Sequence, residues 1–277
     1  MYTSDSSGIH LSKSKVIHRN NEYEESGFNT LIDMQSKHFW YRGRHRFILR
    51  ELLRFEPKSK LMLIDLGGGC GGWVSYLKKK LSNRIEKIAL ADSSRVALLE
   101  AKKCIDDRVE LYQVDLMSLE WDEEWDVAFL LDVIEHCPDD GAIIRQALKA
   151  LKPGGKLIVT VPALKYFWSY NDVHAKHLRR YSKKDFHRLA DDEGLILRDV
   201  RYFMFFLSPL LWLSRKVNKR NISEQKLQKA IEREHKSPPA ILNWLLTIIF
   251  SAETPIGHNI QFPWGTSLLG VFEKKNP

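Results

Sequence analysis

Short apolar runs alternate with helix-forming segments along most of this chain. Several runs end at a glycine cluster, an aspartate or a proline, which is typical of a buried strand that enters a turn. Strands and helices that alternate at this spacing predict a parallel sheet with helices on both faces. The expected strands cover residues 61–66, 87–91, 109–114, 125–133, 156–162, 195–203 and 266–274.

The segments between these runs have helical patterns, over residues 28–55, 73–81, 94–104, 140–151 and 183–192. Ser182 and Asp185 can form a capping box for the last of these helices. Residues 1–27 are polar and show no pattern, so we expect a loose arm there. The chain divides into an N-terminal arm with helices (1–55), an α/β core (56–203), a helical insertion (204–265) and a last core strand (266–277).

The composition indicates a folded core and gives no sign of metals or disulfides. The chain has 277 residues, and 44% of them are hydrophobic. Its three cysteines, Cys70, Cys104 and Cys137, lack metal-ligand spacing, so we expect no metal, no disulfide framework and a reducing cytoplasm. The N-terminal residues do not resemble a signal peptide, and no uninterrupted apolar run reaches the roughly 18 residues of a spanning helix.

The segment from Asp65 to Gly71 carries the main chemical signal. It follows an apolar strand and reads Asp-Leu-Gly-Gly-Gly-Cys-Gly. Gly67, Gly69 and Gly71 can take positive φ angles and let a ligand lie on the backbone, and the following helix points its N-terminus at the same place. This pattern fits a nucleotide-type ligand, although a plain tight turn remains an alternative.

Carboxylates follow the next two strands. Asp92, with Ser93 after it, ends the second strand, where a carboxylate can accept hydrogen bonds from both ribose hydroxyls. Asp115 follows the third strand and could meet an adenine amino group. Such strand ends open on one crevice. An NAD site is the rival interpretation, but the glycines fall as G-x-G-x-G, Trp73 starts the helix, and no hydride-transfer residues are evident.

The successive motifs IDLGGGCGG, ALADSS, QVDLMSL, FLLDVIEHCPDD and LKPGGKLIVTVP resemble those of class I S-adenosylmethionine-dependent methyltransferases. The resemblance extends in order over residues 39–203. It implies S-adenosylmethionine as the cofactor. It also implies a seven-stranded, doubly wound, Rossmann-like α/β sheet in the order 3-2-1-4-5-7-6, with the last strand antiparallel.

The resemblance also implies roles for individual residues. Asp65 would lie near the methionine amino group, Asp132 beneath the methionine portion and Arg44 opposite the methionine carboxylate, unless Arg44 is only a solvated helix residue. Asp92 would hold the ribose, and Leu116 with its neighbouring aspartate the adenine. The implied cofactor-binding residues are Arg44, Asp65, Gly67, Gly69, Gly71, Asp92, Ser93, Asp115, Leu116 and Asp132.

Methyl transfer to a hydroxyl requires an aligned acceptor and a base for its proton, and histidine suits the second task near neutral pH. His136 follows the fourth strand, and His177 lies in an aromatic loop after the fifth. Either can be the base, and packing or capping is the alternative role for both. The candidates for acceptor binding, unless they only pair and pack, are Trp168, Asp172, Arg180 and Tyr181.

The insertion contains two apolar stretches, with a charged, helix-like run over residues 223–236 between them. Both stretches are too short to span a bilayer, and Pro209 interrupts the first. They can pack on the core and roof the substrate pocket, which is the more common use of short apolar helices. A dimer interface is another possibility. In a membrane interface, the residues at headgroup level would be Trp212, Arg215, Lys216, Lys219 and Arg220.

Together these patterns predict a cytoplasmic methyltransferase that acts on an oxygen of a small, sugar-like or lipid-linked acceptor. The segment VPALKYFWSYNDVHAKHLRRYS resembles a bacterial and archaeal subgroup associated with cell-surface glycans. The net charge of +8 keeps RNA or protein methylation open, although no nucleic-acid-binding module is recognisable. Methylation of a quinone or lipid ring, with the apolar insertion as a lid, is a further alternative, and so is a binding module without catalysis.

Overall fold

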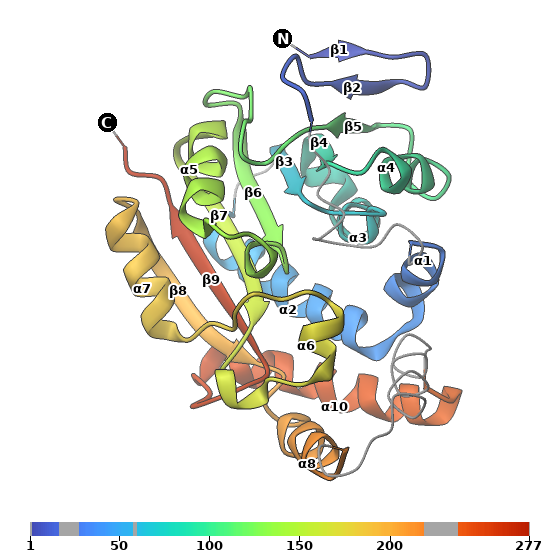
Figure 1. Ribbon diagram of the computed structural model, residues 1–277, viewed down its shortest axis with the longest axis vertical. Helices are drawn as coiled ribbons and strands as arrows, with labels where there is room; N and C mark the ends of the chain where they lie inside the picture. Colours follow the sequence, from blue (N-terminus) through green and yellow to red (C-terminus); the bar gives the residue numbers. More distant parts are fainter. Residues whose placement is uncertain (1, 17–27, 58–59, 219–237, 277) are drawn as a thin grey trace.

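The computed structural model describes residues 2–16, 28–57, 60–218 and 238–276, and it contains a mixed nine-stranded sheet with helices on both faces (Figure 1). The sheet order is β1-β2-β5-β4-β3-β6-β7-β9-β8. The strands are β1 Thr3–Ser4, β2 Ile9–Leu11, β3 Leu61–Leu66, β4 Ile85–Asp92, β5 Val109–Gln113, β6 Trp125–Leu131, β7 Leu151–Pro162, β8 Ile196–Phe203 and β9 Ser267–Glu273.

The sheet has nine strands rather than the expected seven, because the first residues add two. Strand β2 pairs parallel to β5, and β1 pairs antiparallel to β2. Asp5 closes the turn between them by accepting hydrogen bonds from the backbone of Ser7 and Ile9, and Ile9 is fully buried. The expectation of a loose arm is therefore wrong for residues 3–11, whereas residues 17–27 lie outside the described part of the chain.

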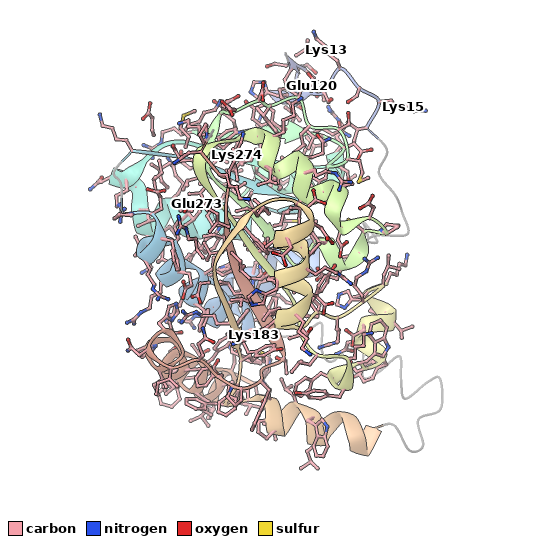
Figure 2. The ribbon with its side chains drawn as sticks, turned by 90° about the vertical axis from the view of Figure 1, so that its left-hand side faces the viewer. Lys13, Lys15, Glu120, Lys183, Glu273 and Lys274 are labelled. Atoms are coloured by element: carbon pink, nitrogen blue, oxygen red, sulfur yellow. The ribbon has the colours of Figure 1, made fainter. Side chains whose placement is uncertain are left out.

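The N-terminal hairpin is also tied to the loop that follows β5. Glu120 accepts hydrogen bonds from the Ser12 hydroxyl and from the backbone of Lys13, and Figure 2 shows Lys13 beside Glu120 at one end of the molecule. Tyr2 packs against the rings of Tyr112 and Trp121. These contacts hold the two short strands, which are too short to be stable alone.

The other seven strands form the part of the sheet that carries the site. They run in the order β5-β4-β3-β6-β7-β9-β8, with β5, β4, β3, β6 and β7 mutually parallel. Strand β9 lies antiparallel between β7 and β8. Residues 152–155, which were expected to end a helix before the fifth strand, fall within β7 at a register irregularity.

The helices agree with the sequence pattern except where local breaks intervene. The expected helix over residues 28–55 is divided at His38, whose side chain caps the second part by accepting from the backbone of Trp40. The predicted capping box of Ser182 and Asp185 is confirmed. The helices are α1 Phe28–Lys37, α2 Phe39–Phe55, α3 Gly72–Leu81, α4 Arg95–Lys102, α5 Asp140–Ala150, α6 Tyr170–His174, α7 Lys183–Asp192, α8 Ser208–Asn218 and α10 Ala240–Asn259, with 3-10 turns at Ser82–Arg84, Ile134–His136 and Lys165–Phe167.

Two apolar clusters fill the space between the sheet and its helices. One contains Ile144 of α5 and Phe186 of α7, and the other contains Phe47 of α2, Val74 of α3 and Phe250 of α10. All five side chains are essentially buried. Each fully buried side chain of this size contributes roughly 1.5–3 kcal/mol to folding. The two clusters hold the carboxyl ends of the parallel strands in fixed positions.

The described part of the insertion is helical, as expected. Helix α10 packs along α2, where Gly43 leaves room for the ring of Phe250. It is longer than the apolar pattern indicates, because it continues past Phe250 and Pro255 to Asn259, and by length and composition alone it could cross a membrane. The predicted helix over residues 223–236 lies outside the described residues.

Candidate functional site

The glycine turn between β3 and α3 lies at the carboxyl edge of the sheet, where residues 67–69 are partly buried. Gly67, Gly69 and Gly71 all have positive φ angles, of 75°, 56° and 77°. A Cβ atom on Gly67 would lie 2.9 Å from Cγ2 of Val133. A Cβ atom on Gly68 would collide with the carboxylate of Asp65. The three left-handed positions and the close packing explain why the turn consists of glycines.

Asp92 connects the glycine turn to the end of β4. Its Oδ2 atom accepts a hydrogen bond of 2.8 Å from the backbone of Gly69, and its Oδ1 atom accepts one of 2.8 Å from the backbone of Ser94. The backbone carbonyl of Ser93, the next residue, accepts a hydrogen bond from the side-chain amide of Gln113. The carboxylate is therefore fixed beside the turn.

Asp115 occupies the corresponding position after β5. Its Oδ1 atom accepts a 2.9 Å hydrogen bond from the backbone of Met117, and the residue is only 8% exposed. Leu116 is partly buried next to it and, like Val133, packs against the apolar cluster that contains Ile144. Strands β3, β4 and β5 are neighbours, so Asp65, Asp92 and Asp115 follow one another along the same edge.

Arg44 of α2 forms an ion pair with Asp132, at the end of β6. Both side chains are largely buried, and the guanidinium carbon lies 4.6 Å from the centre of the Trp40 ring. Asp132 has a positive φ of 59°, a conformation that costs free energy in a non-glycine residue. Arg44 is thus not a solvated helix residue: it reaches the sheet edge beside the glycine turn.

Asp65 lies at the end of β3 and is 2% exposed. Its Oδ1 atom has no hydrogen-bond partner within the described parts of the chain. Burial, and to a lesser degree the negative charge of Asp92, raises the pKa of Asp65 to about 7, although the positive charge of Arg44 acts in the opposite direction. A buried carboxylate of this kind is suited to pair with a cation that a ligand brings.

A second group of polar side chains, the acceptor-side cluster, consists of Glu135, His136 and His177. Glu135 and His136 belong to the 3-10 turn after β6, and His177 follows α6. The two histidine rings lie 4.8 Å apart, and Nε2 of His177 lies 4.0 Å from Oε1 of Glu135. The sequence places His136 and His177 far apart, and the fold brings them into contact.

The cluster is connected electrostatically to the cofactor edge. Burial raises the pKa of Glu135 well above its usual value, and the negative charge of Asp132 adds to this effect. Burial also lowers the pKa of His136 to about 4, so that this ring is neutral at pH 7. Glu135, fully buried, is a site residue that our sequence prediction of catalytic residues did not include.

Asp172 and Arg180 support the cluster rather than line it. Asp172 is fully buried and caps α6 by accepting hydrogen bonds from Ser169, and Oδ1 also lies 3.0 Å from Nδ1 of His177. Arg180 donates to both oxygens of Asp172 and to the carbonyl of Ala163. The ion pair that was the alternative for Arg180 is therefore present.

The side chain of Tyr181 is also buried and hydrogen-bonded within the protein. It is 2% exposed and donates a 2.8 Å hydrogen bond to Oδ2 of Asp140. Trp168 is partly buried where the 3-10 turn Lys165–Phe167 ends. Three of the four residues expected to bind the acceptor are therefore buried and held by the hydrogen bonds given above. Trp168 is the partly buried one and takes no part in those hydrogen bonds.

These features define a Rossmann-like transferase site in which an adenosyl ligand binds at the carboxyl edge of the sheet. The chain belongs to the methyltransferase domain family, whose model matches residues 39–200. It is an S-adenosylmethionine-dependent methyltransferase.

Two curated proteins illustrate the range of its relatives. The chain is 32% identical over 169 residues to the ubiquinone biosynthesis O-methyltransferase of Xanthomonas axonopodis pv. citri, covering 55% of this chain and 69% of that one. It is 26% identical over 175 residues to phosphoethanolamine N-methyltransferase 2 of Caenorhabditis elegans, covering 61% of this chain and 40% of that one. The chain thus spans only part of the length of each relative.

Solved structures show the same fold at low sequence identity. A putative methyltransferase in complex with the Haloferax volcanii Trm112 activator is 16% identical, with a TM-score of 0.61 over 94% of this chain and 100% of that one. Phosphoethanolamine N-methyltransferase 2 of Haemonchus contortus, in complex with S-adenosyl-L-methionine, is 18% identical, with a TM-score of 0.57 over 92% of this chain and 58% of that one.

Proposed function

We propose that this enzyme transfers the methyl group of S-adenosylmethionine to a hydroxyl oxygen of a lipid-linked, sugar-like acceptor at a membrane surface. The observation that carries the proposal is the acceptor-side cluster. Glu135, His136 and His177 lie close together beside the cofactor edge, and atoms of Glu135 and His136 have no hydrogen-bond partner among the described residues. A hydroxyl group can donate a hydrogen bond to such an acceptor.

The cofactor residues take the roles that the family resemblance implies. Asp65 pairs with the methionine ammonium group, and Arg44, held by Asp132, faces the methionine carboxylate. Asp92, fixed at the end of β4 beside the glycine turn, holds the ribose hydroxyls. Asp115 and Leu116, with Ser93 nearby, border the adenine. The turn at Gly67, Gly69 and Gly71 supports the methionine portion.

The acceptor oxygen attacks the methyl carbon in line with the carbon–sulfur bond, whose electron pair returns to sulfur. The hydroxyl proton must leave during this step. His136 or His177 is the base in this proposal, and His177 has the better support because Asp172 orients its ring. The similarity to a ubiquinone biosynthesis O-methyltransferase supports oxygen as the methylated atom.

The lipid-linked acceptor is supported by the exposed apolar side chains of α8 and α10. Ile241 is 77% exposed and Trp244 60%, and Leu210 and Leu213 of α8 are both more than half exposed. Both helices lie at the end of the molecule opposite the N-terminal hairpin (Figure 1). Patches of large apolar residues on a surface mark contact with membranes or partners. Trp212 is 39% exposed, while the four basic residues expected at headgroup level lie beyond the described side chains.

The test is to incubate the purified enzyme with methyl-labelled S-adenosylmethionine and cell extract, and then to separate lipid, glycan, RNA and protein fractions. We expect label in the lipid fraction, as a methyl ether that resists mild alkali. Label confined to RNA or to protein would overturn the proposal. The apolar face equally suits a quinone or lipid ring as acceptor, and in that case the labelled product would absorb ultraviolet light and lack sugar.

A further inference from the structure

The acceptor-side cluster has no hydrogen-bond donor for its most buried group. Both carboxylate oxygens of Glu135 lack a hydrogen-bond partner among the residues that the structure describes, and the side chain is 0% exposed. Nδ1 of His136 also lacks one within that part of the chain. A buried carboxylate without hydrogen bonds is costly, and a bound cation would remove that cost.

The hydrogen bonds of the two histidines leave one nitrogen of each ring with a lone pair. Nδ1 of His177 lies 3.0 Å from a carboxylate oxygen of Asp172, which can only accept, so Nδ1 carries the proton and Nε2 is left with a lone pair. His136 bonds the backbone of Ala175, and because its Nδ1 has no partner within the described residues, Nε2 makes that bond. Both rings are therefore fixed as ligands.

We propose that Glu135, His136 and His177 bind a divalent transition-metal ion, Zn²⁺ being the best match to their chemistry. The three ligand atoms lie within 4.8 Å of one another. Two imidazoles and one carboxylate are the ligand set of several catalytic zinc sites, and ligands about 3.3 Å apart would satisfy the zinc bond lengths of roughly 2.0–2.1 Å. Small side-chain rotations would close the difference.

The surroundings of the cluster also suit a metal site. Asp172 holds the far nitrogen of His177, and Arg180 holds Asp172, which is the pattern of outer hydrogen bonds that orients metal-bound histidines. With three protein ligands, a tetrahedral ion would keep one position open. The cluster lies beside Asp132 at the cofactor edge, so this position can face the acceptor.

What the ion does rests on the proposed function. An acceptor hydroxyl bound at the open position would have a lowered pKa, because the ion stabilises the alkoxide. With the ion bound, the metal would take over the task that the proposed function gives to a histidine base. The O–H bond would break with the proton passing to water, since both imidazoles would be occupied as ligands. The alkoxide oxygen would form the new bond to the methyl carbon, and S-adenosylhomocysteine would leave.

Binding can be tested without any acceptor. Tag-free protein is stripped with a chelator and titrated with Zn²⁺ against a chromophoric competitor, and with Co²⁺ while the visible d–d absorption is recorded. We expect one ion per chain, and at least 100-fold weaker binding in His177→Ala and in the isosteric Glu135→Gln. Asp172→Asn should weaken binding by about 10–100-fold. His187→Ala removes an exposed histidine of α7 and should change nothing.

Several outcomes would overturn the inference: no Zn²⁺ bound at 100-fold molar excess, or equal losses in His187→Ala and His177→Ala. Glu135→Gln guards against unfolding, because it removes a buried charge and should leave the melting temperature equal or higher. If no ion binds and the label still enters lipid, this inference alone fails. If an ion binds and the label enters only RNA or protein, the proposed function fails and the metal site stands.

Discussion

Arg180 and Asp172 form a buried, bidentate ion pair, in which Nε lies 2.7 Å from Oδ1 and Nη2 lies 3.1 Å from Oδ2. The same Oδ1 atom lies 3.0 Å from the ring of His177. The position of His177 therefore depends on a side chain, Arg180, that need not touch the acceptor itself. The neighbouring Arg179 donates to the carbonyls of Cys137 and Pro138, which follow His136 in the chain.

Replacing Arg180 should impair both folding and turnover. Arg180→Leu leaves the charge of Asp172 buried without its partner, and breaking such a pair costs about 3–5 kcal/mol. The free energy of unfolding, measured in urea, should fall by this amount, and kcat should fall because the ring of His177 loses its orientation. Arg188→Leu, an exposed arginine of α7, should change stability by no more than about 0.5 kcal/mol. Equal effects in the two variants would contradict this account.

Cofactor affinity should depend on pH through Asp65. The pKa of this carboxyl is raised to about 7, so it is neutral below pH 7 and cannot then pair with the methionine ammonium group. Affinity should therefore rise with pH up to about pH 7, and fall by about tenfold for each pH unit below it. Calorimetry between pH 5.5 and 7.5 measures this, with Asp65→Asn as the control. A dependence that persists in Asp65→Asn would assign it to another group.

The glycine turn should not tolerate alanine where the packing is close. Gly67→Ala and Gly194→Ala both place a Cβ on a residue with positive φ, at 75° and 66°, which costs about 1–2 kcal/mol in either case. Only Gly67→Ala also meets Val133, whereas the added Cβ on Gly194 has no atom within 4 Å among the described residues. We expect a larger loss of stability in Gly67→Ala than in Gly194→Ala, and at least tenfold weaker S-adenosylmethionine binding in Gly67→Ala alone, measured by calorimetry.

The apolar face of α10 should control membrane binding without contributing to stability. Trp244 and Ile248 are 60% and 45% exposed, so the double variant Trp244→Ser, Ile248→Ser should unfold within about 0.5 kcal/mol of the wild type. Co-flotation with anionic lipid vesicles should drop severalfold. Val96→Ser, on α4 and 41% exposed, is the matched control and should float normally. Undiminished flotation of the double variant would remove the membrane from the proposed function.

The sequence predicted those elements that are determined by residues close together in the chain. The parallel strands were visible as apolar runs, and the capping box of Ser182 and Asp185 was visible because four residues suffice to form it. Strands β1 and β2 were not visible, because two and three residues give no periodicity. Their pairing depends on β5, which lies about a hundred residues further along the chain.

Site residues that directly follow a strand could be predicted from the sequence. Contacts between segments that are distant in the chain could not. The glycine turn, Asp92 and Asp115 could be placed from their order along the chain. The pairing of Arg44 with Asp132 and the burial of Glu135 arise only when α2 and α6 are packed on the sheet. For the same reason, the sequence could not show that Arg180 and Tyr181 are already bonded to Asp172 and Asp140.

The antiparallel strand β9 has a consequence for biosynthesis. It fills the gap between β7 and β8, yet more than sixty residues separate β8 from it in the chain. Until residues 267–273 have been synthesised, one edge of β7 and one of β8 expose their backbone groups, and such edges readily pair with other chains. The nascent enzyme therefore passes through an aggregation-prone stage, during which we expect holdase chaperones to engage it.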